Sequence, residues 1–138
     1  MNGFLKDDLT VALDEVDRTA SRIVTIYEDL SGIAPEPLVA DQLRDAGERH
    51  RRALVAFNHA RRAAGQIPEV ADPERAHLQS LWLALRSAVS GEASRVRLDQ
   101  ALDELDEELR RAVAAARALG PEPALRDALD RLAQDLQR

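Results

Sequence analysis

Apolar residues recur at steps of three and four along most of the chain, which is the spacing of one face of an α-helix. The first run predicts a helix over residues 4–31 and consists of Leu5, Leu9, Ala12, Val16, Ala20, Ile23, Tyr27 and Leu30. The most regular run predicts a helix over residues 93–119 and consists of Leu98, Leu102, Leu105, Leu109, Ala112, Ala116 and Leu119. A final run predicts a helix over residues 122–137 and consists of Leu125, Leu129, Leu132 and Leu136.

One inward position of a further helix, predicted over residues 35–64, is occupied by a histidine. The apolar run there consists of Val39, Leu43, Ala46, Ala53, Phe57, Ala60 and Ala64. His50 fills the gap between Ala46 and Ala53, so we expect it to face the interior. Two interpretations follow: His50 is a metal ligand, or it is a core residue hydrogen-bonded to Tyr27, a backbone carbonyl or an acidic side chain.

Glycine and proline residues separate these helices and set the expected topology. Asp72-Pro73-Glu74 has the order of an N-cap, a first-turn proline and a first-turn acid, and predicts a shorter helix over residues 73–90 that contains Trp82. No segment alternates as a strand does. We therefore expect an all-α fold, one domain over residues 1–138, with two antiparallel hairpins and the short helix 73–90 in the connection between them.

Composition and charge limit the classes of site and of binding partner that the chain can have. Cysteine is absent, which excludes disulfides and thiolate metal sites, and the net charge of −6 argues against nucleic acid. No membrane-spanning or signal-like segment is present, so we expect a cytoplasmic protein without a membrane partner. Arginine greatly outnumbers lysine, which suggests a bacterial genome rich in GC. The arginine-rich helix 35–64 is expected to lie between the acidic helices 4–31 and 93–119.

The order of helices carries a family resemblance. Two long helices are followed by a short helix that contains a tryptophan, then by a third long helix and a last helix. The pattern of a crossover segment is found in residues 76–86, Gly91 and the joint at residues 65–68. On these features the chain resembles the ferritin-like (rubrerythrin-like) four-helix-bundle bacterial domains of unknown function over nearly its whole length. The resemblance implies a four-helix bundle whose hairpins are joined by a crossover. In the wider ferritin-like superfamily it also implies a di-iron centre, with one Glu from each of two helices and Glu-x-x-His from each of the other two.

The ligand set that the resemblance implies is incomplete in this chain. Gly47 stands three residues before His50, where the carboxylate of the Glu-x-x-His pair is required, and residues 122–137 contain no histidine. His50, Asp17 and Glu108 remain as candidate metal ligands, three where six are expected. The sequence therefore predicts a degenerate metal site.

Three functional hypotheses remain open. The leading one is a non-enzymatic bundle without a cofactor that associates with itself, as a homo-oligomer such as a dimer, or with a protein partner. Leu83 and Val55 favour it, because a single bundle is not expected to bury them. The alternative is an iron-binding ferritin-like protein with a reduced ligand set around His50. The third is a small-molecule site beside Gly47.

Overall fold

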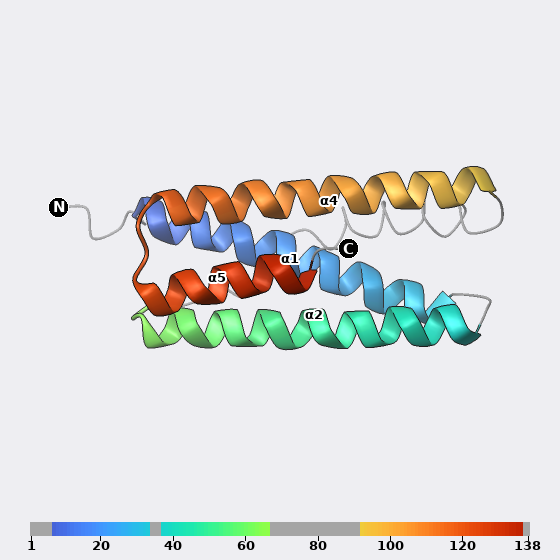
Figure 1. Cartoon of the computed structure of the whole chain (residues 1–138), viewed down its shortest axis with the longest axis horizontal. Helices are drawn as coiled ribbons and strands as arrows, with labels where there is room; N and C mark the ends of the chain where they lie inside the picture. The colour runs from blue at the N-terminus through green and yellow to red at the C-terminus, as the bar shows by residue number, and fades with distance from the viewer. Residues whose placement is uncertain (1–6, 34–36, 67–91, 137–138) are drawn as a thin grey trace.

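The described part of the chain is entirely helical (Figure 1). A computed structural model describes residues 7–33, 37–66 and 92–136. Its helices are α1 (Asp8–Ile33), α2 (Pro37–Ala63), α4 (Glu92–Ala118) and α5 (Pro123–Leu136). The predicted all-α class is confirmed for these residues, among which there is no strand. The helix expected over residues 73–90, with Trp82 and Leu83, lies outside the described residues.

Side-chain and proline chemistry sets where the helices begin. α1 begins at Asp8 rather than at residue 4, because the Asp7 carboxylate accepts a hydrogen bond of 2.7 Å from the backbone N–H of Thr10. Hydrogen bonds from the side chain and backbone of Thr10 also lower the pKa of the Asp7 carboxyl group. α2 and α5 each begin with a proline, whose missing N–H costs nothing in the first turn.

Glycines follow the ends of α2 and α4. α2 ends at Ala63, where Gly65 adopts a φ of 85° and the Gln66 N–H donates to the Arg61 carbonyl at 2.9 Å. This is the pattern in which a glycine lets the chain reverse while the last carbonyls keep partners. α4 ends at Ala118, with Gly120 at a φ of 67°. The bounds predicted for these helices, 35–64 and 93–119, thus lie within about two residues of the observed ones.

The packing order of the helices differs from the one expected from charge. α1 packs against α2 and α4, and α2 packs against α1 and α5. The expectation that the arginine-rich helix lies between the acidic ones is wrong, because it is the acidic α1 that lies between α2 and α4. Arg61 meets Asp14, while Arg51, earlier in α2, meets Glu28, later in α1. Therefore α1 and α2 run in opposite directions.

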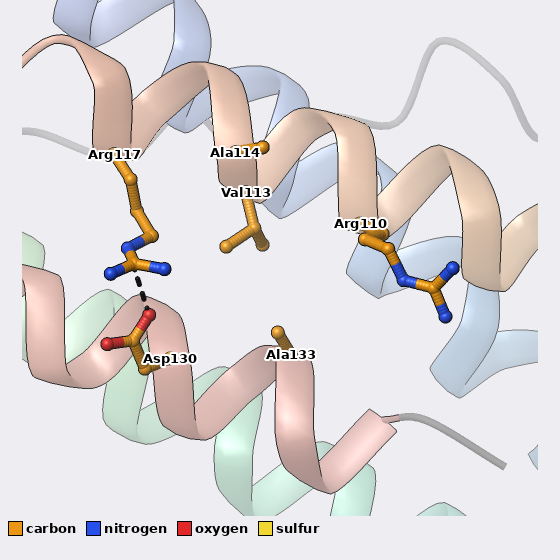
Figure 2. A pocket seen from close by; sticks show the side chains of 6 residues that line it. All are labelled: Arg110, Val113, Ala114, Arg117, Asp130 and Ala133. Carbon is orange, nitrogen blue, oxygen red and sulfur yellow. Dashed lines mark ion pairs between the residues drawn. The ribbon is translucent and has the colours of Figure 1, made fainter.

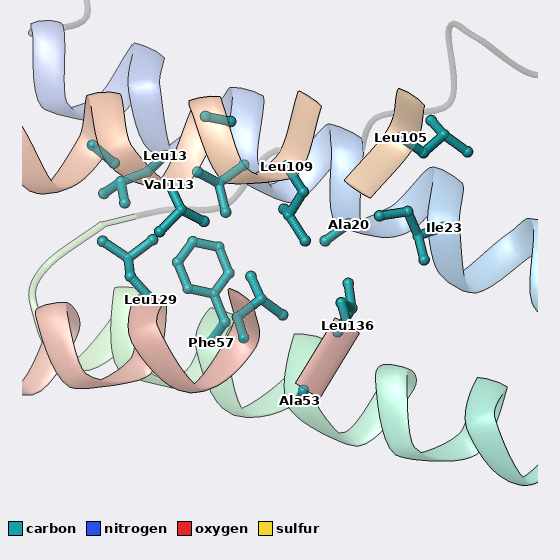
Figure 3. Close-up of a cluster of buried hydrophobic side chains, with 14 of the residues drawn as sticks. Leu13, Ala20, Ile23, Ala53, Phe57, Leu105, Leu109, Val113, Leu129 and Leu136 are labelled. Atoms are coloured by element: carbon teal, nitrogen blue, oxygen red, sulfur yellow. The ribbon is translucent and has the colours of Figure 1, made fainter. Parts of the chain in front are cut away.

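The hydrophobic core lies where all four described helices meet (Figure 3). Phe57 is at its centre, surrounded by fully or almost fully buried side chains that include Leu13, Val16, Leu109 and Leu129. α5 has 14 residues, about 21 Å at 1.5 Å per residue, whereas α1 has 26 residues. As a result α5 ends part-way along the bundle, and Asp135 in its last turn lies close enough to His50 to act on its charge. No helix in the described ranges is long and apolar enough to cross a membrane.

Candidate functional site

His50 lies inside the bundle, as its place on the apolar stripe of α2 predicts. Its side chain is 2% exposed and meets the Tyr27 ring edge-on, with centroids 4.5 Å apart and planes at 89°. Tyr27 was one of the expected neighbours, and the contact is an aromatic one. The Nδ1 atom of His50 has no hydrogen-bond partner among the described residues.

The surroundings of His50 keep its imidazole neutral. Burial lowers its pKa to about 4, with a smaller contribution from the positive charge of Arg49, while the negative charge of Asp135 acts in the opposite direction. A neutral imidazole has one N–H and one nitrogen lone pair. In the tautomer with the hydrogen on Nε2, Nδ1 carries a lone pair and no hydrogen. Burial of a lone pair without a hydrogen-bond donor costs less free energy than burial of an N–H without an acceptor. Such a nitrogen can accept a hydrogen bond or bind a metal ion.

The structure does not bring the three candidate ligands together. Asp17 is 9% exposed and its Oδ1 accepts a hydrogen bond of 3.2 Å from Asn58, which lies eight residues, or about 12 Å, beyond His50 on α2. Burial raises the pKa of the Asp17 carboxyl group, although Asn58 and Arg61 favour its ionised form. Among the residues described, no group of three or more His, Asp or Glu side chains is placed to hold a metal ion.

Glu108 faces a different helix pair from His50. Its carboxylate lies 3.6 Å from the guanidinium of Arg22, between α4 and α1, and its side chain is 54% exposed. His50 and Asp17, by contrast, lie where α2 meets α1. The two acids are thus engaged elsewhere, and the reduced ligand set around His50 stays a prediction.

Gly47 lets α1 approach α2 closely. A Cβ atom built on Gly47 would lie 3.6 Å from the Tyr27 Cβ and 3.7 Å from the Glu28 Cγ. These are ordinary van der Waals contacts, so the space beside Gly47 is already bounded by α1. The third hypothesis places a small molecule in this space. The space that Gly47 leaves open is the size of one methyl group.

A row of polar pairs between α1 and α2 was not anticipated from the sequence. It comprises Thr10 with Gln66, Asp14 with Arg61, and Asp17 with Asn58, and we call it the polar seam. At its centre Arg61 is 0% exposed, and its Nη2 lies 2.9 Å from Asp14 Oδ1. The guanidinium also lies 5.9 Å from the centre of the Phe57 ring. A signal was present: Arg61 follows His50 by eleven residues, which is about three helical turns and returns to the same face.

The polar seam is incompletely satisfied. Nε and Nη1 of Arg61 and Oδ1 of Asn58 are buried without a hydrogen-bond partner within the described ranges. Buried polar groups without partners cost free energy that packing elsewhere must offset. The polar seam is therefore expected to add little to net stability.

A surface groove lies between α4 and α5 (Figure 2). Val113, Ala114 and Ala133 form its apolar part, and Arg117 of α4 reaches across to Asp130 of α5 at 3.1 Å. Arg110 also lines the groove and pairs with Glu107 of its own helix at 2.8 Å. The groove is remote in sequence from Gly47, and the charges that line it are already matched within the chain.

Comparisons with protein-family models, with curated proteins and with solved structures gave no significant match.

Proposed function

We propose that the protein acts by association, with another copy of itself or with a protein partner, and not by catalysis. The observation that carries the proposal is Val55, which is 63% exposed on the outer side of α2 although the inner side of that helix is packed around Phe57. Removal of an exposed apolar side chain from water by contact with a second molecule is favourable. Val55 is also one of the two residues that the sequence analysis did not expect a single bundle to bury.

The interior side chains support a structural role for the groups that could carry chemistry. His50 packs against Tyr27, Asp17 is held by Asn58, and Arg61 is paired with Asp14. Each is thus engaged in holding α1 and α2 together. A catalytic site instead needs several such groups converging on one reacting atom.

We also propose that the bundle is ferritin-like. In Figure 1, α1 and α5 run in one direction and α2 and α4 in the other, so the end of α2 and the start of α4 lie at opposite ends of the bundle. This is the order expected of two antiparallel hairpins joined by a crossover. We further propose that the protein is cytoplasmic.

Self-association is tested by sedimentation velocity of the full chain over a wide range of concentrations. The proposal expects a concentration-dependent shift from monomer to dimer. A monomer throughout, in a protein that also captures no partner, would contradict it.

Iron binding around His50 is a second candidate, supported by the unmatched Nδ1 of that residue. Protein prepared with supplementary iron is compared with its His50→Ala variant by metal analysis. The second candidate expects bound iron that the substitution removes. Equal and negligible metal in both proteins would end it.

A further inference from the structure

The outer face of α2 carries three exposed residues at equal spacing. Glu48, Val55 and Arg62 are seven residues apart, which is 20° short of two full turns, so all three lie along one side of the helix. Along the helix axis, Glu48 lies about 10 Å before Val55 and Arg62 lies about 10 Å after it. An apolar centre is thus flanked by a negative charge on one side and a positive charge on the other.

In the part of the chain that the structure describes, the two flanking charges have no ion-pair partner. Both Glu48 and Arg62 are exposed. Elsewhere on the surface, by contrast, Arg44 pairs with Asp41 and Arg51 pairs with Glu28. The face at residues 48–62 therefore offers charges that a second molecule can match.

A face with this arrangement is complementary to itself. When two copies of a helix pack antiparallel about a two-fold axis, each residue meets one that lies equally far on the other side of the axis. With the axis at Val55, Glu48 of one copy meets Arg62 of the other, and the same pair forms a second time by symmetry. Parallel packing would instead bring like charges together.

Resting on the association proposed above, we infer that a second copy of this chain packs its α2 antiparallel on this face, with the two-fold axis at Val55. The two Val55 side chains meet at the centre. The aliphatic stems of Arg52, on the same outer side, cover the apolar contact while their charged ends stay in water. The paired charges set register and direction more than they set affinity.

Charge reversal at the two flanking positions tests this arrangement. Glu48→Arg places Arg against Arg62 in both symmetric contacts, and Arg62→Glu places Glu against Glu48. Each variant alone is expected to weaken dimerisation by about tenfold or more. The double variant Glu48→Arg/Arg62→Glu is expected to dimerise as the natural chain does, because both contacts then join opposite charges. An equimolar mixture of the two single variants is expected to form mixed dimers for the same reason.

Controls with the same charge changes come from the exposed side of α5. Asp127→Arg and Arg126→Glu alter the net charge as the test variants do and are expected to leave the dimer unchanged. Sedimentation equilibrium gives the dissociation constant of each protein, and circular dichroism shows that each has kept its helices.

The results separate this inference from the association on which it rests. If the natural chain dimerises but Glu48→Arg and Arg62→Glu dimerise equally well, the α2 arrangement is wrong and association through another face stands. Failure of the mixture or of the double variant to recover dimerisation also overturns the arrangement. If the natural chain is a monomer at all concentrations, self-association itself fails.

Discussion

Arg61 of α2 and Asp14 of α1 form an ion pair of 2.9 Å in which the arginine side chain is wholly buried and the aspartate is 14% exposed. The pair joins the two helices near the start of α1 and the end of α2. Removing a charge from water is costly, and the attraction of its partner offsets that cost only while both are present. The two residues are therefore expected to depend strongly on one another.

Loss of Asp14 should destabilise the protein far more than loss of both residues. Asp14→Ala leaves the guanidinium of Arg61 buried without its carboxylate and is expected to lower the free energy of unfolding by about 3 kcal/mol. Asp14→Ala/Arg61→Met removes the charge as well and should recover most of that loss. Urea unfolding of both variants and the natural chain provides the comparison. Equal losses in the single and double variants would show that the ion pair is not what matters.

Stability should decline in mild acid because of His50. Its pKa is about 4 in the folded protein and near 6.5 when unfolded, so the unfolded chain takes up a proton first as the pH falls. The contribution of neutral, buried His50 to the free energy of unfolding is therefore fully present above pH 6.5 and is lost as the pH falls toward 4. At 1.36 kcal/mol for each unit of pKa shift, the loss reaches about 3 kcal/mol.

Substitution of His50 isolates this effect. His50→Gln should flatten the slope of unfolding free energy against pH between about pH 6.5 and pH 4. His59→Gln, the same substitution at an exposed position of α2, is the matched control. Asp17 has a raised pKa and so contributes a slope of the opposite sign, which both variants retain. An unchanged slope in His50→Gln would contradict the assignment to this residue.

Two glycine substitutions should have opposite effects. Gly47→Ala places a methyl group in ordinary contact with Tyr27 and Glu28 inside a helix, and is expected to stabilise by about 0.5–1 kcal/mol. Gly120→Ala meets no atom within 4 Å, but its φ of 67° strains an L-residue, so it should destabilise by about 1 kcal/mol. Thermal unfolding distinguishes the two. Destabilisation by Gly47→Ala would mean that α1 cannot accept the methyl group.

Much of the fold could be predicted from periodicity alone. The leucine stripe through Leu102, Leu105 and Leu109 marks α4, and each of these residues is buried. The inward position of His50 followed from the same reasoning, because a helix returns to one face every three or four residues. The start of α1 was missed because an apolar residue at position 5 extends the stripe beyond the cap at Asp7.

The polar interior and the helix order could not be predicted in the same way. Arginine is expected at the surface, and only the approach of Asp14 from another helix makes the burial of Arg61 tolerable. The order of helices depends on which faces meet in three dimensions. Net charge is too weak a guide to that order, because an exposed ion pair contributes only about 0–1 kcal/mol.

Val55 gives the most direct test of association. Val55→Glu places two like charges together on the proposed axis, while the exposure of this position predicts little change in the stability of a single chain. Thermal unfolding of dilute protein checks that stability.

Sedimentation equilibrium of the natural chain beside Val55→Glu is the decisive measurement. The account predicts that the natural chain reaches twice the mass of one chain as its concentration rises, and that Val55→Glu remains a monomer over the same range. A natural chain that stays monomeric, or a Val55→Glu variant that dimerises equally well, would contradict it.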